Sequence, residues 1–296
     1  DGTLSILQEP VEYHFTAPVQ TTVENTDDGI FSGYVSIAAR VTNKIASNYF
    51  NGKIEAPKIV VDGQVLASWD LSEEISSQNV KALLGPDIAL QNFPTRAVTS
   101  SEWDGSEMCW RHKPSHYAAI HFHEDDIYDF EWETSLTFKI PPKMSSGVYV
   151  MRIECDGNQD AMPFYVCPPL GKRSAKLCVL IPTFTYAIYG NHARPDYDIS
   201  WQQRIKDWSA YPYNPAEYPH YGLSTYNCHP DGSGICHASH RRPLLNLRPG
   251  YITFGDTPCS GLRHFQADSH LISWLHAKNI EYDVITDTEL QHDGLK

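Results

Sequence analysis

The sequence of 296 residues predicts a multi-domain protein whose first part is rich in β-strands and whose last part is α/β. Three observations predict this. Short apolar segments separated by Gly, Pro and Asp turns fill the first 170 residues. A short polar linker, GKRSA, follows at 171–175. Beyond it, strand, helix and strand patterns succeed one another, which is typical of a parallel sheet.

The elements of the first part are short strands. IFSGYVSIAARV (30–41) partly alternates apolar with small or polar residues, and two apolar runs around Asp62-Gly63 predict a hairpin. Further strands are predicted at WETSLTFKIPP (132–142), GVYVMRIECDG (147–157) and AMPFYVCPP (161–169). Short strands with such turns favour antiparallel sandwiches.

The second part opens with KLCVLIPTFTY (176–186), a continuous apolar run typical of a strand buried on both faces. A helix is predicted at SWQQRIKDW (200–208) and a short buried strand at YITFGD (251–256). DSHLISWLHAKNI (268–280) has helical apolar spacing, with Asp268 or Ser269 as its N-cap. EYDVITD (281–287) reads as a strand and TELQHDG (288–294) as a short helix stopped by Gly.

Composition excludes some classes of function. A net charge of −13 argues against a nucleic-acid partner, and a membrane span would need an apolar run that the sequence lacks. No signal peptide is evident at the start. Seven cysteines without C-x-x-C favour free thiols in a reducing compartment, so we expect a cytoplasmic protein. Because the last strand–helix unit lacks a following strand, we expect an internal piece of a longer polypeptide, or one product of a split chain.

Two segments are placed where chemistry is expected in an α/β sheet, beyond the carboxyl ends of strands. They are 182–198, directly after the first buried strand, and the long aromatic loop 210–245, which we expect to be an ordered wall of a site. The loop contains a cluster of Cys228, His229, Cys236, His237 and His240. Its spacing departs from that of structural zinc sites, so packing around the DGSG turn is the stronger interpretation.

Eight tyrosines lie between residues 186 and 226. Most are expected to pack the walls of the loop. A phenol is a poor ligand for Zn²⁺ or Mg²⁺ at neutral pH, whereas Fe³⁺ can displace its proton and bind the phenolate. A rival metal site is the pair His121 and His123 in IHFHEDD, which would share one face of a strand, near His112 and His116. Its alternative is a polar strand end.

Several long stretches resemble one family. IPTFTYAIYGNHAR, YPHYGLSTYNCHPDGSG, RPGYITFGD and SGLRHFQADSHLISWLHAKNIEYDVITD are similar to the large subunit of N,N-dimethylformamidases. LQNFPTRAVTSSEWDGSEMCWRHKPSHYAAIHFHEDD and SGVYVMRIECDGNQDAMPFYVCPP resemble the same subunit upstream, and YFNGKIEAPKI resembles the end of its lectin-like region. The resemblance covers nearly the whole chain in order.

The resemblance implies three domains. They are the end of a concanavalin- or lectin-like jelly-roll (1–95), an immunoglobulin-like β-sandwich (96–170), and the start of a parallel α/β sheet like that of glutamine amidotransferases (171–296). It also implies an amidohydrolase that cleaves small N-substituted formamides to formate and an amine. A small partner subunit would complete a hetero-oligomer that associates further.

The resemblance further implies a mononuclear non-haem iron, held by two tyrosines and a glutamate. Carried over to this sequence, the tyrosines are Tyr186 in TFTY and Tyr226 in STYN, with Tyr189 and Tyr221 as alternatives. The glutamate is expected in a motif beyond Lys296. The piece would then supply two of three protein ligands, so we expect it to hold iron weakly and to be inactive alone.

The proposed chemistry needs further groups. Fe³⁺ would act as a Lewis acid on the amide carbonyl and lower the pKa of a bound water. The amine must be protonated as it leaves, and His192, His229 and His264 are candidates for that acid. Asn191 and Asn227 are candidates to donate to the carbonyl oxygen or to position water, and His229 is also a candidate to support a metal ligand. Phe184 and Tyr189 are candidate aromatic walls around the substrate's methyl groups.

Two other functions stay open at this stage. One is a non-catalytic module that binds carbohydrate or protein, because sandwiches make up two of the three implied domains. The other is an amidohydrolase of the same architecture with a different substrate.

Overall fold

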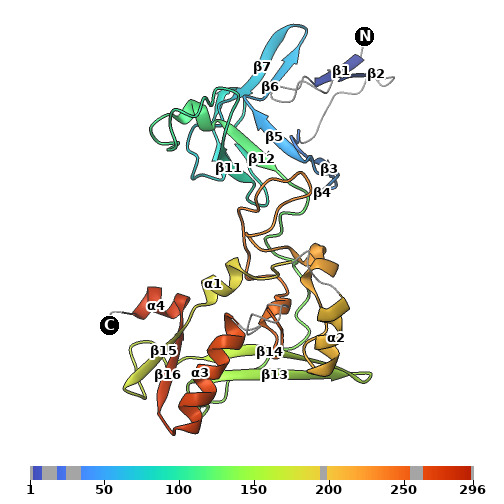
Figure 1. Cartoon of the computed structure of the whole chain (residues 1–296). Coiled ribbons are helices and arrows are strands. Elements are labelled where there is room, and N and C mark those ends of the chain that lie inside the picture. Colours follow the sequence, from blue (N-terminus) through green and yellow to red (C-terminus); the bar gives the residue numbers. More distant parts are fainter. Residues whose placement is uncertain (1–2, 9–18, 25–34, 194–198, 254–262, 295–296) are drawn as a thin grey trace. The chain divides into compact units, whose positions relative to one another are not determined.

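A computed structural model describes residues 3–8, 19–24, 35–193, 199–253 and 263–294 (Figure 1). The chain divides into two compact units, Asp1–Glu124 and Asp125–Lys296. Most of the described sheets are small and antiparallel, and helices are few. Within the described residues, every helix is too short or too polar to cross a membrane.

Unit 1 consists of small antiparallel sheets and one turn of 3-10 helix. Its elements are β1 (Thr3–Gln8), β2 (Val19–Glu24), β3 (Arg40–Thr42), β4 (Ile45–Ser47), β5 (Gly52–Glu55), β6 (Lys58–Val61), β7 (Gln64–Trp69), β8 (Asn79–Val80), β9 (Ala82–Leu84), β10 (Ile88–Ala89), β11 (Thr95–Val98), η1 (Pro114–Tyr117) and β12 (Ala119–Phe122). The two largest sheets have the orders β6-β7-β9 and β11-β12-β5. The core lies between them and consists of Ala67, Trp69, Leu71, Val80 and Ile120.

The predicted hairpin at Asp62-Gly63 is confirmed as the β6–β7 connection. Asp62 has φ of 48° and Gly63 has φ of 77°. Two consecutive residues in the left-handed region form the turn whose twist matches a two-residue hairpin, and Asp-Gly adopts it at low cost.

In the residues that the structure describes, unit 2 combines a long hairpin with a parallel pair of strands and four α-helices (Figure 1). The elements are β13 (Gly147–Cys155), β14 (Asn158–Val166), β15 (Leu177–Ile181), α1 (Thr183–Ile188), α2 (Ile199–Asp207), η2 (Pro215–Glu217), η3 (Pro219–Tyr221), η4 (Leu245–Leu247), α3 (Phe265–Ala277), β16 (Tyr282–Thr286) and α4 (Asp287–Asp293). β13 and β14 pair antiparallel, whereas β15 and β16 pair parallel with Val179 opposite Val284. The strand–helix–strand order predicted for this part is therefore present.

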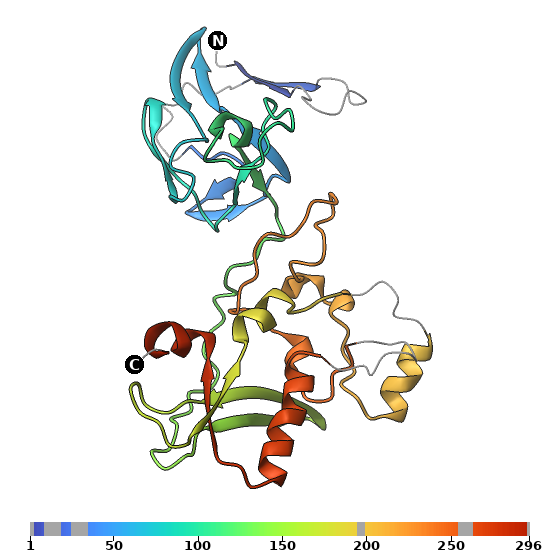
Figure 2. The same cartoon turned by 60° about the vertical axis from the view of Figure 1, so that its left-hand side comes forward.

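The core of unit 2 contains residues from the parallel strands and from two helices. Ile181 and Val284 from the parallel strands pack with Tyr186 of α1 and Phe265 of α3. A second cluster contains Trp201, Ile205 and Ile252. Figure 2, a turned view, shows α3 crossing beside the parallel strands and the long hairpin. The end of β15, the start of α1 and the first turn of α3 thus meet around one buried tyrosine.

Several predicted elements differ in the structure. Residues 132–142 form no strand, because alternation alone supplies no partner for a ladder. Tyr251–Thr253 are also not in a strand, and the rest of that predicted strand lies outside the described residues. α3 begins at Phe265 rather than near Asp268. β15 is a strand, but Leu177 and Leu180 are exposed and only Ile181 of its residues is buried.

Candidate functional site

The carboxyl ends of the parallel strands hold the helix that carries the first predicted ligand. β15 ends at Ile181 and α1 starts two residues later. Asp287, the first residue of α4 after β16, accepts hydrogen bonds from the Phe184 backbone N–H (2.7 Å) and from Thr183 Oγ1 (3.3 Å). A carboxylate at the N-terminus of a helix satisfies N–H groups that have no partner within the helix. The end of the second strand therefore fixes the start of α1.

Tyr186 is buried at this junction, with 2% of its surface exposed. Its hydroxyl donates a hydrogen bond to the carboxylate of Asp268, in the first turn of α3. Burial, and then this hydrogen bond, raise the pKa of Tyr186 above its ordinary value. The neighbouring hydroxyl of Tyr165, on β14, is buried without a hydrogen-bond partner among the described residues. Oxygen atoms from three elements thus gather in one apolar interior.

Tyr226 lies in the long loop in a very different environment, 59% exposed. Its ring stacks on that of Tyr189 at a centroid distance of 4.3 Å and an interplanar angle of 11°. The Tyr189 and Tyr226 hydroxyls share a hydrogen bond of 2.7 Å, and this contact raises the pKa of Tyr226. The structure therefore brings two phenol oxygens together, one from the predicted ligand Tyr226 and the other from Tyr189, one of the two alternatives named from the sequence.

His264 connects the two tyrosine environments. Its ring centroid lies 6.5 Å from that of Tyr186 and 4.5 Å from that of Tyr189. Burial, and then the nearby Arg263 cation, lower the pKa of His264 to about 4. His264 precedes α3 with φ of 55°, a region that non-glycine residues seldom adopt. Ring contacts therefore run continuously from Tyr186 through His264 and Tyr189 to Tyr226.

The predicted catalytic residues His192 and Asn227 lie beside this array. The His192 ring is 6.4 Å from that of Tyr226, edge to face, and its Nδ1 is 3.2 Å from Ser224 Oγ. Ser224 is fully buried and donates to Asn227 Oδ1 at 3.1 Å. The Asn227 amide also pairs with the backbone of Ala193, accepting at 3.1 Å and donating at 2.8 Å. Asn227 therefore holds the loop against the segment after α1, while its role towards a substrate stays a prediction.

His229, the third predicted catalytic residue, is buried in a separate contact with two carboxylates. Its Nδ1 lies 2.6 Å from Asp125 Oδ1, and its Nε2 lies 3.6 Å from Asp126 Oδ1. The cysteines of the same cluster, Cys228 and Cys236, are exposed, and Cys236 contacts the Gly234 carbonyl. The imidazole thus faces carboxylates rather than the sulfur atoms of the cluster.

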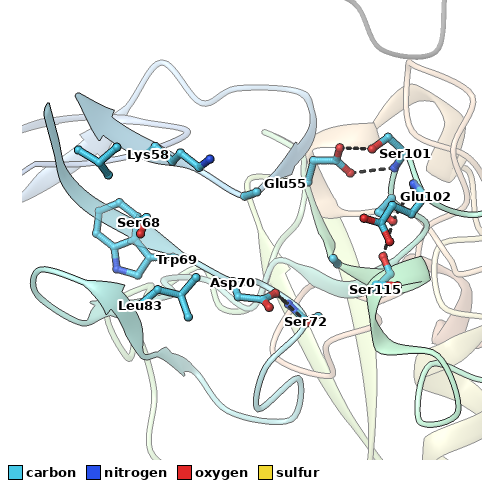
Figure 3. A pocket seen from close by; sticks show the side chains of 14 residues that line it. Glu55, Lys58, Ser68, Trp69, Asp70, Ser72, Leu83, Ser101, Glu102 and Ser115 are labelled. Atoms are coloured by element: carbon cyan, nitrogen blue, oxygen red, sulfur yellow. Dashed lines mark hydrogen bonds between the residues drawn. The ribbon is translucent and has the colours of Figure 1, made fainter. Parts of the chain in front are cut away.

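Unit 1 contains a shallow hollow of about 510 Å³ (Figure 3). Two of its carboxylates are engaged within the wall: Glu55 accepts from the Ser101 backbone at 2.8 Å and from its hydroxyl, and Asp70 accepts from Ser72 (Figure 3). The rings of His121 and His123, at the end of the central strand β12, lie 4.0 Å apart, so the two histidines of this H-x-H are close together. A metal at that pair stays a prediction.

The oxygen groups around α1 suit the iron implied by the resemblance. Fe³⁺ favours anionic oxygen, and phenolate is an established iron ligand. Tyr186, Tyr189 and Tyr226 supply phenol oxygens, and Asp268 supplies a carboxylate at the buried end of the array. The donor chemistry fits; Tyr189 lies directly beside Tyr226, whereas the Tyr186 hydroxyl faces Asp268.

Tyrosines, histidines and an acid thus lie near the ends of the parallel strands, where ligands bind in α/β sheets. Comparison with known proteins is more specific. The sequence model of the family "N,N-dimethylformamidase beta subunit-like, C-terminal" matches residues 95–296. The chain therefore belongs to the N,N-dimethylformamidase beta subunit-like family.

Two relatives are similar over much of this chain. The N,N-dimethylformamidase beta subunit of Paracoccus aminophilus is 34% identical over 279 residues, covering 83% of this chain and 36% of the relative. The N,N-dimethylformamidase beta subunit of an Alcaligenes species is 30% identical over 321 residues, covering 96% of this chain and 41% of the relative. The chain thus spans about two fifths of the length of these curated relatives.

Proposed function

We propose that this chain is part of an amide hydrolase that cleaves N,N-dimethylformamide, or similar small N-substituted formamides, to formate and an amine. The array of ring contacts from Tyr186 to Tyr226 at the ends of the parallel strands carries this proposal. Membership of the family supports the same reaction class, because both relatives are named as subunits of N,N-dimethylformamidase.

We assign Tyr186 and Tyr226 as the residues that hold a mononuclear non-haem iron, with Tyr189 as the alternative to Tyr186. When bound, Fe³⁺ would supply Lewis-acid activation of the amide carbonyl. The nitrogen must gain a proton as the C–N bond breaks, and we assign this delivery to His192, which Ser224 orients through its Nδ1. Asn227 is assigned to positioning water or the carbonyl oxygen, and His229 to holding the loop through Asp125.

The finer architecture belongs to the same proposal. We assign 1–95 to a lectin-like sandwich, 96–170 to an immunoglobulin-like sandwich and 171–296 to an amidotransferase-like α/β domain. We also assign the protein to the cytoplasm. The designation "beta subunit" of both relatives supports a small partner subunit within a hetero-oligomer.

The test measures iron content and formate release in protein purified from its native cells with the chains that accompany it. We expect stoichiometric iron, a visible tyrosinate-to-iron absorption band and formate production from N,N-dimethylformamide. Tyr226→Phe should lower iron content and activity together, and comparison of Tyr186→Phe with Tyr189→Phe identifies the second ligand. Tyr213→Phe is the matched control, since Tyr213 lies in the same loop but contacts Tyr211 and Tyr218.

Three results would redirect the proposal. Unchanged iron content in Tyr226→Phe rejects Tyr226 as a ligand. Colourless, iron-free protein that binds saccharides favours the binding-module alternative. Hydrolysis of other amides without formate release from N,N-dimethylformamide favours an amidohydrolase with a different substrate.

A further inference from the structure

Two segments of unit 2 carry the stacked tyrosine pair. Tyr189 directly follows α1, and Tyr226 belongs to the stretch 221–227. The backbone between them offers one direct contact, from the Thr225 N–H to the Ile188 carbonyl at 3.2 Å. The hydroxyl pair is exposed, so its own hydrogen bond supplies little to hold the segments in register. Asn227 ties the far ends of the two segments through its hydrogen bonds to the Ala193 backbone, and two further side chains connect the segments near Gly222.

The side chain of Arg242 connects the two segments. It is buried, and its guanidinium donates hydrogen bonds to backbone carbonyls of both. On the α1 side, Nη2 donates to Ala187 O (3.0 Å) and Gly190 O (3.2 Å). On the loop side, Nη1 donates to Gly222 O (2.5 Å) and Leu223 O (2.6 Å), and Nε donates to Ser239 O (2.9 Å). A planar guanidinium with donors fixed on two edges can tie two chain segments at a set distance, which an ammonium group cannot do.

The contact with Arg242 requires a glycine at position 222. Gly222 has φ of 79°, and a Cβ there would lie 3.1 Å from Arg242 Nη1. A side chain at this position would strain the backbone and press on the guanidinium. The close approach of the loop to Arg242 thus depends on a residue without a side chain.

Asn191 makes a second bridge between the same segments. It is completely buried, and its Nδ2 donates to Gly222 O (3.0 Å) and Pro243 O (2.7 Å). Its Oδ1 accepts from the Leu245 N–H at 2.9 Å. Asn191 has φ of 58°, which Asn tolerates better than most residues. Both bridges therefore end on the carbonyl of Gly222.

We propose that Arg242 and Asn191 are positioning residues that hold the stretch 221–227 against the end of α1 and so keep the hydroxyls of Tyr189 and Tyr226 in contact. Neither side chain touches the tyrosine rings; both act through the backbone of Gly222. The consequence for catalysis rests on the proposed function, but the positioning itself is measured without metal or substrate.

The test compares Arg242→Lys with Arg241→Lys. Arg241 is the matched control because it is adjacent and exposed, and pairs with Asp129 at 3.1 Å. Hydrogen exchange of the metal-free protein is followed in 187–193 and 221–227, with the β13–β14 hairpin as internal reference. We expect exchange in both segments to rise about tenfold or more in Arg242→Lys, because several hydrogen bonds are lost at once, and to stay unchanged in Arg241→Lys.

A second variant and a second readout guard against simple unfolding. Asn191→Gly keeps the left-handed backbone and removes the side-chain bridge, so it should raise exchange in the same segments. Near-ultraviolet circular dichroism reports on the stacked Tyr189–Tyr226 pair. Arg242→Lys should reduce this signal when it is made in the natural sequence, but should leave the signal unchanged when it is made in Tyr189→Phe.

The outcomes separate this proposal from the enzymatic one. Unchanged exchange in 221–227 in both variants overturns the positioning role, as does exchange that rises equally in the β13–β14 hairpin. Full iron content in Tyr226→Phe would reject Tyr226 as an iron ligand. The positioning role would still be decided by the exchange measurements on the metal-free protein.

Discussion

The two tyrosines assigned to iron have opposite surroundings. Tyr186 is buried in the core of unit 2 and its hydroxyl donates a hydrogen bond to Asp268, whereas Tyr226 is exposed and stacks on Tyr189. The family resemblance named Tyr186 in the sequence, and its place after the first buried strand agrees with that choice, because ligands of α/β sheets bind at this edge. The pairing of Tyr189 with Tyr226, and the place of Ser224 and Arg242, depend on contacts across tens of residues that no local pattern encodes.

These surroundings predict different costs for removing each hydroxyl. Tyr186→Phe leaves the partly buried Asp268 carboxylate without this donor, so we expect the free energy of unfolding to fall by about 1–3 kcal/mol. Tyr226→Phe should cost less, because its hydroxyl is exposed to water. Urea unfolding of both metal-free variants measures the difference. Equal losses would show that the Asp268 contact adds no stability.

Elements of secondary structure followed the sequence where their signals were local. The β6–β7 hairpin is specified by Asp62-Gly63, and α4 starts with a capping box between Thr286 and Glu289. α1 was not predicted as a helix, because its N-terminal N–H groups are satisfied by Asp287, about one hundred residues away. The run 132–142 alternates like a strand yet has no ladder, since a strand also requires a neighbour.

A long-range contact also fixes the linker to β16. Asp283 is buried and accepts hydrogen bonds from the Ser174 N–H (2.7 Å) and hydroxyl and from the Ala175 N–H (3.0 Å). Burial alone would raise the pKa of Asp283, but these hydrogen bonds outweigh it and the pKa is lowered. The folded state therefore binds this proton less readily than the unfolded state does.

The sign of the pH dependence follows. The stability that Asp283 contributes is present above its unfolded pKa of about 4 and is lost as pH falls through the lower folded value. Asp283→Asn should thus be less stable than the natural protein near neutral pH, and the gap should narrow in acid. Urea unfolding across this range measures the gap, with Asp156→Asn in the exposed β13–β14 turn as control. A gap that stays constant with pH would contradict this account.

At the scale of the whole molecule, each unit has its own apolar core. In unit 1 it is built around Trp69, Val80 and Ile120, and in unit 2 around Ile181, Phe265 and Val284. The sequence indicated a change of architecture from the composition shift near 171–175, because the continuous apolar run at 176–186 differs from the alternating segments before it. The division of the chain after Glu124 has no such signal, since it depends on which segments share a core.

Separate cores predict separate unfolding. Val80 is 1% exposed in one core and Val284 is 0% exposed in the other, so the same substitution probes each unit. Val→Ala at either site removes two buried methyl groups and leaves a cavity, at a cost of about 1–3 kcal/mol. Calorimetry should resolve two transitions in the natural protein, with Val80→Ala lowering the temperature of one and Val284→Ala that of the other. A single transition that both variants shift alike would mean that the two cores unfold as one cooperative unit.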